Sequence, residues 1–406
     1  MFLEKKINQN FTNIVILCII MTINTQLRLF NLPLGFGEII LLLLGFYVIY
    51  SQNSYEVIKE IFKNKILVLF WLLYLLILTL GSLYTVYVDI HLEPRMIVHD
   101  YLAYFFILMV IIILQLQNDY KENDYTMQKT IIFIVIFFSL VFIIPQSFFE
   151  TFGLMKYYGG EGARFTALSK NPNQLSLLYS PILFLTIYYF KDKRRILFVL
   201  LILELVVITQ IKGQALYLSI ISGVISLFIY YLCIEIQKRR KLKFFLLFNF
   251  IIILCFLIIV ALEYSFIYKI VFDIFVSIVD DSRTLALHRI TLLINGFSNF
   301  MLSPIIGLGG GPHSYLEIVN HTSEAHNTLI DILTQTGIIG FFMYIILFYY
   351  IGKHLINQKK IFLFSALIAL FVFSLFHFVL RQPIFWFYLF YLYNERKGLE
   401  LVKKNY

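Results

Sequence analysis

The sequence predicts an all-α protein, a polytopic transmembrane helical bundle of about 12 spans. Hydrophobic residues make up 60% of its 406 residues and charged residues only 14%. This composition, with a mean hydropathy of +0.83, excludes an ordinary soluble globular protein. Apolar runs of roughly 20 residues, long enough to cross a bilayer, recur along the chain. Such continuous runs form helices rather than barrel strands, because each segment must satisfy its own backbone groups.

The apolar runs are spread over the whole sequence, and no repeat or linker divides them, so residues 1–406 are predicted to form a single integral membrane domain. The first run begins near Phe11 and lacks a small-residue cleavage site, which indicates a retained span rather than a signal peptide. The expected spans are 11–30, 34–50, 66–84, 100–117, 130–148, 175–190, 196–209, 214–235, 244–262, 328–352, 361–380 and 384–394.

The distribution of basic residues predicts the orientation. Most of the 33 Lys and Arg residues fall in segments that these spans place on one face of the membrane. Because cytoplasmic loops are enriched in Lys and Arg, this face and both termini are expected to be cytoplasmic. The basic runs at 191–195 and 238–243 are interpreted as cytoplasmic stop signals, with a nucleic-acid or anionic-lipid site as the alternative. The first interpretation is favoured, so no nucleic-acid partner is expected.

A smaller set of basic residues falls in or beside the loops of the opposite face, where the same rule disfavours cations. An anionic ligand on that face would explain them. Arg164 lies in the glycine-containing segment 150–174, in which Asn171-Pro172 ends the loop before the next span. Lys212 lies in a short connection where Gly213 is expected to allow a tight turn; snorkelling of Lys212 to water is the alternative.

A large extracytoplasmic loop, 263–337, holds the densest group of ionisable residues. Such groups are costly beside a bilayer, so their concentration predicts a functional site. The first half of the loop has helical periodicity with apolar faces, which predicts helices along the membrane surface that carry Arg283 and Arg289. A glycine run that includes Gly309 and Gly310 follows, and we interpret it as a source of exposed backbone N–H groups.

His326 directly precedes Asn327, a residue that favours the N-cap position of a helix, and a long apolar span follows. The histidine would therefore lie at the positive end of a transmembrane helix, which favours the neutral imidazole. A neutral imidazole can accept a proton from a hydroxyl group. The histidine spacings match no known metal motif, so no metal site is expected. No nucleophile motif of the serine hydrolases occurs, which argues against a covalent serine hydrolase.

The segment 282–340 resembles the core of the O-antigen ligase/Wzy polymerase superfamily of polytopic membrane glycosyltransferases. The resemblance covers roughly residues 160 to 345. Its motifs are Arg289, the turn Pro304–Gly309, His326-Asn327, Gly337–Gly340 and, upstream, Arg164 with Asn171–Asn173. Many members carry Ser-Arg-Gly where this chain has Ile211-Lys212-Gly213. Lys212 lacks the bidentate fork that arginine offers to phosphate oxygens.

The resemblance implies transfer of a glycan outside the cytoplasm from an undecaprenyl-pyrophosphate-linked donor, without a nucleotide sugar, a metal or another cofactor. His326 would be the general base toward the acceptor hydroxyl. Cations would stabilise the negative charge of the leaving diphosphate, and the candidates are Arg289, Arg283, Arg164 and Lys212. The residues that would shape the loops or contact the glycan are Gly309, Gly310, Asn327 and Asn173.

Within this family we predict a Wzy-like repeat-unit polymerase, which builds O-antigen or capsular polysaccharide on the outer face of a bacterial cytoplasmic membrane. An O-antigen ligase-type transferase to another acceptor is the first alternative. A flippase or transporter of the lipid-linked oligosaccharide is the second, and is disfavoured because the polar residues gather at one face rather than in paired halves. The expected partners are the lipid-linked oligosaccharide and membrane lipid, with a chain-length regulator and a flippase as further candidates.

Overall fold

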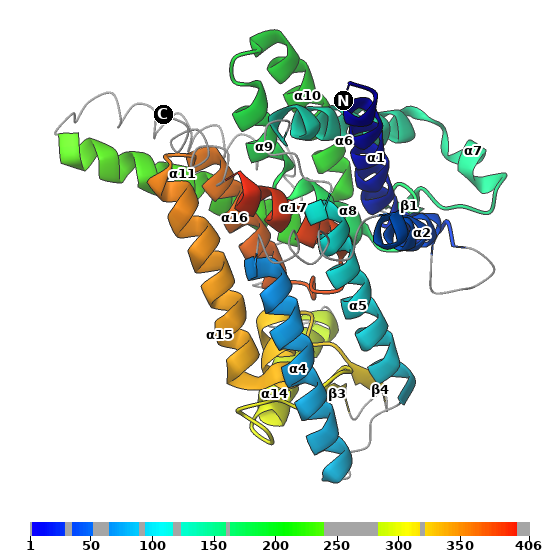
Figure 1. Ribbon diagram of the computed structural model, residues 1–406, viewed down its shortest axis with the longest axis vertical. Coiled ribbons are helices and arrows are strands. Elements are labelled where there is room, and N and C mark those ends of the chain that lie inside the picture. The colour runs from blue at the N-terminus through cyan, green and yellow to red at the C-terminus, as the bar shows by residue number, and fades with distance from the viewer. Residues whose placement is uncertain are drawn as a thin grey trace.

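Long apolar helices form a stem, and shorter helices gather around one end of it (Figure 1). The computed structural model describes residues 2–28, 35–51, 65–88, 94–116, 123–159, 163–238, 283–316 and 321–395. Three helices make up the stem: α4 (Lys65–Tyr87), α5 (Pro94–Leu116) and α15 (Thr328–Asn357). Of these, α4 packs against both α5 and α15. The predicted helical character of the chain is confirmed.

Five helices in the described part of the chain are long and apolar enough to cross a membrane. They are the three stem helices together with α6 (Asn123–Ile143) and α11 (Gln214–Lys238). These helices agree with a membrane protein, but they do not confirm the full number of predicted spans. The expected span 244–262 lies outside the described residues, as does most of the first part of the expected outer loop 263–337.

Two of the expected spans are not single helices that are long enough to cross a bilayer. The span 175–190 is divided into α8 (Pro172–Tyr179) and α9 (Ile182–Phe190), and Pro181 stands at the division, where it has no N–H group for the helix ladder. The span 384–394 lies in α17 (Pro383–Asn394), which is buried along its whole length. At 12 residues and roughly 1.5 Å per residue, α17 is about 18 Å long, against roughly 30 Å for the hydrocarbon core.

Shorter helices and two small hairpins make up the rest of the described structure. The helices are α1 (Phe2–Met21), α2 (Phe36–Ser51), α7 (Gln146–Glu150), α10 (Arg194–Ile211), α14 (Arg283–Phe300) and α16 (Ile361–Ser374). In the antiparallel hairpins, β1 (Tyr157–Tyr158) pairs with β2 (Arg164–Phe165), and β3 (Ser314–Leu316) pairs with β4 (His321–Ser323). The helix expected around Arg283 and Arg289 is confirmed as α14. The hairpins have no counterpart among the sequence predictions.

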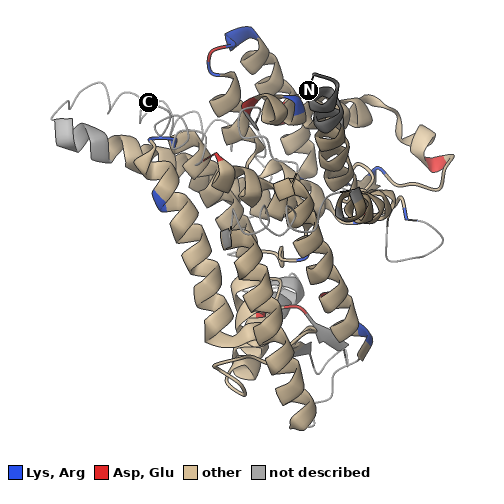
Figure 2. Cartoon of the chain, viewed as in Figure 1, with Lys and Arg blue, Asp and Glu red and all other residues tan. Residues whose placement is uncertain are grey.

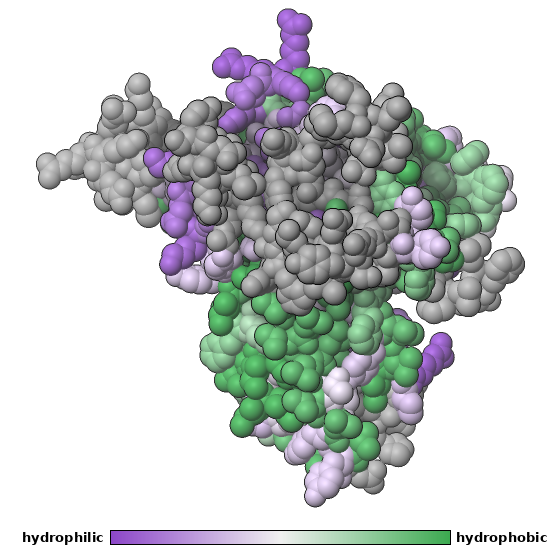
Figure 3. Space-filling view, in the orientation of Figure 1, coloured by the Kyte–Doolittle hydropathy of each residue, from purple (hydrophilic) through white to green (hydrophobic). Residues whose placement is uncertain are grey.

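The surface of the stem is apolar, as a lipid-facing bundle requires. Figure 3 shows a hydrophobic area over the lower half of the view, where α4 and α15 lie, and hydrophilic side chains toward the upper end. Large apolar side chains point outward in this region: Leu83 is 62% exposed, Leu102 65% and Ile346 58%. Figure 2 shows Lys and Arg gathered at the turn between α9 and α10 and missing from the middle of the stem helices.

Aromatic side chains hold the centre of the bundle together. The ring of Trp386 on α17 lies 4.7 Å from that of Trp71 on α4, and Trp71 lies 5.2 Å from Tyr104 on α5. The hydroxyl groups of Tyr74 and Tyr104 both donate to Oε1 of Gln335 on α15, at 3.0 and 2.7 Å. These two buried hydroxyls are thus satisfied, and four helices meet at one group of rings.

A break in α15 joins this helix to the segment that follows α14. Gly337 has φ 64° and ψ −162°, a conformation that is essentially limited to glycine. The segment that follows α14 enters the broken ladder: Leu308 N–H donates to Thr334 O at 2.7 Å, and Gly309 N–H donates to Gln335 O at 2.9 Å. On the other side of the break, Ile338 N–H donates to Pro304 O at 2.9 Å. The Pro304–Gly309 and Gly337–Gly340 motifs therefore form one structural unit.

Replacing Gly337 by Ala should cost about 3 kcal/mol of folding free energy, because the backbone conformation excludes alanine and the new Cβ would clash. That Cβ would lie 2.3 Å from Ile305 O. Gly153→Ala is the matched control: Gly153 has φ +67°, but nothing lies within 4 Å of an added Cβ. In this variant only the left-handed backbone conformation should lower the folding stability, by about 1 kcal/mol. Thermal unfolding of the two purified variants measures the difference, and equal losses would contradict the role given to the break.

Candidate functional site

His326 lies just before α15, at a point where tertiary contacts hold the chain. Asn327 caps the helix, since its Oδ1 accepts the N–H groups of Leu329 and Ile330 at 3.0 and 3.2 Å. The helix start predicted from Asn327 is thereby confirmed. The same side chain donates through Nδ2 to Leu375 O at 2.8 Å. His326 itself has φ 52°, a left-handed conformation that is uncommon outside glycine and tends to occur at functional sites.

A small polar cavity of about 150 Å³ lies beside His326. Three segments that are far apart in the sequence line it: the start of α8, the stretch before α15, and the loop between α16 and α17. Its polar lining consists of Asn171, Asn173, Gln174, Glu324, His326, His377, Arg381 and Gln382. Two of the predicted site residues, His326 and Asn173, thus border the same space.

Arg164 connects Asn173, which lines this cavity, to the connection that carries Lys212. Arg164 donates through Nε to the carbonyl oxygen of Ile211 at 3.2 Å, and through Nη2 to Oδ1 of Asn173 at 3.3 Å. Asn173 lies in the first turn of α8, which Asn171 caps by accepting the N–H group of Asn173 at 2.9 Å. Because Asn173 contacts Arg164 and also lines the His326 cavity, it connects the two parts of the predicted site.

The turn at Lys212 differs from the expected one. Lys212 itself ends α10 in the left-handed conformation, with φ 49°, whereas the sequence had assigned the tight turn to Gly213. Gly213 has another role, since a Cβ at this position would lie 2.5 Å from Oγ of Ser176 on α8. The glycine therefore allows close packing of the connection against α8, and the lysine carries the unfavourable backbone conformation.

Arg283 and Arg289 are placed through their backbone, as residues of α14. Their side chains lie outside the described residues. Helix α14 packs against α15 and β3, and Gly296 permits a close approach to Ile330 near the start of α15. The helix that carries both arginines therefore lies beside the first turns of the helix that follows His326.

Gly309 and Gly310 are buried in the protein rather than facing a ligand. The N–H group of Gly309 is bonded to α15, as described above, and that of Gly310 donates to Oγ of Ser82 on α4 at 3.1 Å. Gly309 also needs its missing side chain, since it has φ 83° and a Cβ would lie 2.2 Å from Ser82 Oγ. The expectation that this run offers exposed N–H groups is wrong, because α4 and α15 lie on top of it.

Lys156, which was expected on the outer face, needs no ligand to explain it. Its ammonium group donates to the carbonyl oxygens of Phe142 and Ile144, both at 2.5 Å, at the end of α6. The side chain is buried among the rings of Phe142, Phe149 and Tyr157. Burial lowers the pKa of this ammonium group below its ordinary value. Lysine at a helix C-terminus satisfies carbonyl groups that have no partner within the helix.

Two residues to which the sequence assigned no role, Asp100 and Arg381, connect the site to the membrane helices. Asp100 on α5 is 2% exposed and accepts hydrogen bonds from the N–H of Gly311 at 2.9 Å and from Nε2 of Gln335 at 3.0 Å. It also forms an ion pair with Nη1 of Arg381 at 2.9 Å. A carboxylate within an apolar span was the signal that could have revealed this pair.

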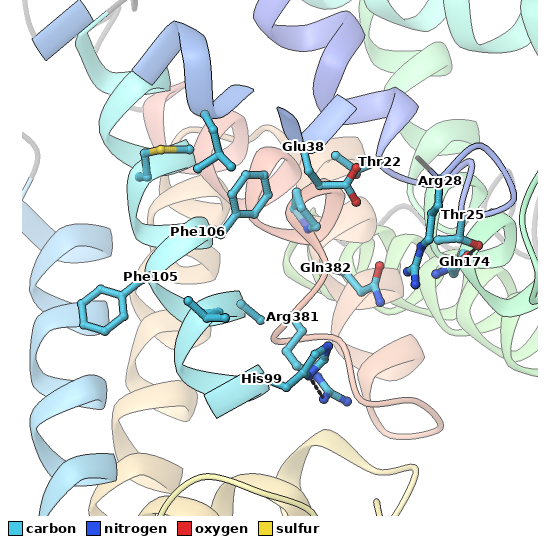
Figure 4. Close-up of a pocket in the computed structure, with 15 residues that line it drawn as sticks. Thr22, Thr25, Arg28, Glu38, His99, Phe105, Phe106, Gln174, Arg381 and Gln382 are labelled. Atoms are coloured by element: carbon cyan, nitrogen blue, oxygen red, sulfur yellow. Dashed lines mark hydrogen bonds between the residues drawn. The ribbon is translucent and has the colours of Figure 1, made fainter. Parts of the chain in front are cut away.

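A second, larger cavity of about 540 Å³ lies between α1, α2, α5 and the α16–α17 loop (Figure 4). Its apolar wall consists of Leu42, Leu102, Ala103, Phe105, Phe106 and Met109. Its polar residues include Arg28, Glu38, His99, Gln174 and Arg381, and Figure 4 shows His99 and Arg381 next to each other. Gln174, Arg381 and Gln382 line both cavities, so the two spaces are neighbours.

Lys212→Gly should raise the free energy of unfolding by about 1 kcal/mol, because glycine adopts the left-handed conformation without the penalty that lysine bears. If the lysine serves a ligand, catalytic activity should fall in the same variant. Lys212→Ala is the control: it removes the charge without relieving the backbone, so activity should fall while the unfolding temperature does not rise. Thermal unfolding and product formation measure the two effects, and equal stability of both variants would contradict a strained lysine.

Acidification should destabilise the protein through His313, which is buried with Nε2 2.8 Å from Gly309 O. Burial lowers the pKa of this imidazole when the protein is folded. The unfolded chain, in which histidine has a pKa of about 6.5, then binds more protons, so stability present above that pH is lost as the pH falls below it. The unfolding temperature of His313→Gln should depend less on pH than that of the wild type in this range. Identical pH profiles would refute this.

Comparison with known proteins identifies one family. Residues 197–345 match the family model described as O-antigen ligase. The match extends from α10 through α14 to the first half of α15, and so includes Lys212, Arg289 and His326. No curated protein matches the chain. The match over residues 197–345 supports membership of this chain in the O-antigen ligase/Wzy superfamily.

Proposed function

We propose that the protein is an oligosaccharide repeat-unit polymerase of the Wzy kind, which transfers a glycan from undecaprenyl pyrophosphate to a lipid-linked repeat unit. Family membership supports glycan transfer of the O-antigen ligase or polymerase type. One observation carries the proposal further: Asn173 bonds to Arg164 and lines the cavity beside His326. A cation for a diphosphate and an imidazole for a hydroxyl group thus lie on either side of one asparagine.

The larger cavity supports a lipid-linked donor. It shares residues with the His326 cavity, and its wall includes Leu102 and Phe105, whose side chains are largely exposed on the apolar surface of the stem. An isoprenyl chain could lie along this wall while its diphosphate remains near the polar residues at the junction of the two cavities. A pocket lined by apolar side chains with a few converging polar groups is typical of a site for such a ligand.

The proposed reaction gives each group one role. The imidazole of His326 takes the proton of the acceptor hydroxyl, whose oxygen bonds to the anomeric carbon of the donor sugar. The bond between that carbon and the diphosphate oxygen breaks, its electron pair stays on the diphosphate, and the anomeric configuration inverts. Cations stabilise this charge, and the proposed ones are Arg164, Lys212, Arg289 and Arg283. Loss of one of them should raise the barrier by about 2–4 kcal/mol, as for other single electrostatic donors.

The proposed setting is a bacterial cytoplasmic membrane, with both termini in the cytoplasm and the site facing outward. The basic run 191–195, in the α9–α10 turn, supports this orientation. The proposed partners are the lipid-linked oligosaccharide and the surrounding lipid, together with a chain-length regulator and a flippase that would supply the donor.

O-antigen ligase-type transfer to another acceptor is the second candidate, and the description of the matching family favours it. A strain that lacks the protein separates the two. Single repeat units on the cell surface would mean that a polymerase has been lost. Long lipid-linked polymer that stays untransferred would mean that a ligase has been lost.

His326→Ala should abolish product formation, because the imidazole that is proposed to take the proton of the acceptor hydroxyl is then missing. The measurement is incubation of the purified protein with a lipid-linked oligosaccharide of known structure, followed by separation of the products by length. The wild type should give a ladder, and the variant only the starting material. His354→Ala, near the other end of α15, is the control and should keep the ladder. A ladder from the folded His326 variant would refute the proposed base.

A further inference from the structure

Arg381 occupies the junction of the two cavities. It belongs to the loop between α16 and α17, and it lines both the larger apolar cavity and the small cavity beside His326. The loop itself is fixed to the start of α15: Thr328 Oγ1 donates to His377 O at 2.6 Å and accepts the N–H group of Val379 at 3.1 Å. The guanidinium group therefore has a fixed position between an apolar wall and the imidazole.

Two carboxylates share this guanidinium group, and they differ in how firmly they are held. Asp100 is buried, accepts two further hydrogen bonds as described above, and lies against Nη1. Glu324 pairs with Nη2, its side chain is 28% exposed, and it lies in the short stretch between β4 and α15. Movement of Asp100 would leave the N–H of Gly311 without its buried partner, which is costly. Glu324 can turn toward the cavity at much smaller cost.

A guanidinium group binds carboxylate and phosphate oxygens through the same fork of N–H donors. The carboxylate of Glu324 therefore occupies the place that a phosphate group would take. The apolar wall on the other side of Arg381 indicates what that phosphate is attached to, because a free phosphate would gain nothing from Phe106 or Met109. Arg28 lies in the same cavity as a second cation, with the carboxylate of Glu38 nearby (Figure 4).

We propose that Arg381 binds the diphosphate of an isoprenyl diphosphate ester, and that Glu324 is its counter-ion only while this ligand is absent. The inference rests on the proposed function, and it adds a residue outside both the matched family segment and the motifs of the sequence. Asp100 is the positioning residue, which keeps the guanidinium group aimed at the junction. The diphosphate displaces Glu324, which lies two positions before His326 in the sequence. The isoprenyl chain then lies along α5.

The test measures binding of farnesyl diphosphate to the purified full-length protein in detergent. Arg381→Gln should weaken this binding by about 10- to 100-fold, the loss expected for a charged hydrogen-bonding partner. Glu324→Gln should strengthen it several-fold, because the competing carboxylate is gone. Arg195→Gln, a charge at the cytoplasmic end of α10, is the matched control and should leave the affinity unchanged. Unchanged affinity in Arg381→Gln, or weaker binding in Glu324→Gln, would overturn the proposal.

Two further ligands identify what the site recognises. Inorganic pyrophosphate should bind much more weakly than farnesyl diphosphate, and farnesol should not respond to either substitution. Equal affinity for inorganic pyrophosphate would refute the isoprenyl part of the proposal. If Arg381→Gln does not fold because Asp100 loses its partner, the double variant Asp100→Asn/Arg381→Gln removes both charges, and Glu324→Gln tests the displacement independently.

Binding and turnover also separate this proposal from the proposed function. If the wild type binds farnesyl diphosphate through Arg381 but forms no ladder from the lipid-linked oligosaccharide, the proposed reaction is wrong and the diphosphate site remains. If the ladder forms but neither Arg381→Gln nor Glu324→Gln changes the affinity for farnesyl diphosphate, the proposed reaction stands and the assignment of Arg381 is wrong.

Discussion

A helix that breaks inside a membrane has to find new partners for the backbone groups that it frees, and the rest of this structure depends on how α15 does so. The break at Gly337 is filled by the segment that follows α14, which bonds to both sides of it. This segment is therefore anchored within the bundle rather than resting on its surface. This anchor sets the position of the first half of α15, and with it the positions of Asn327 and His326.

The candidate site is assembled from segments that are brought together by such anchors. Arg164 comes from a hairpin, Asn173 from a capped helix start, Lys212 from a tight connection and His326 from the stretch between β4 and α15. None of these elements could position its residue alone, because each of the four residues lies in a turn or hairpin or at a helix terminus. The rigid parts are the aromatic centre around Trp71 and the buried carboxylate of Asp100, which joins α5 to the glycine run, to Gln335 and to Arg381.

Local features of the site could be predicted from the sequence, because capping involves residues within three positions of each other. Asn327 and Asn171-Pro172 mark helix starts correctly for this reason. The glycine run was misjudged because its partners are remote: Gly310 bonds to Ser82, 228 positions away, and Gly311 bonds to Asp100, 211 positions away.

Other features were hidden because hydropathy does not record backbone geometry. The span expected at 175–190 has an uninterrupted apolar character, yet its chain divides at Pro181. A left-handed lysine at position 212 also leaves no trace in composition or periodicity. The ion pair of Arg381 with Asp100 joins residues 281 positions apart, so only the folded bundle reveals that these two charges belong together.

The complete burial of α17 has a consequence for how the protein matures. This helix follows all the other described elements in the chain, yet it contacts α1, α5, α8, α15 and α16. During synthesis, the earlier segments must enter the membrane and wait with an unfilled centre until α17 is translated. Arg381 stands two residues before this helix, in the loop that Thr328 holds against the start of α15. A nascent chain that ends before Arg381 therefore lacks a residue that lines both cavities, and the junction between them is completed only late in synthesis.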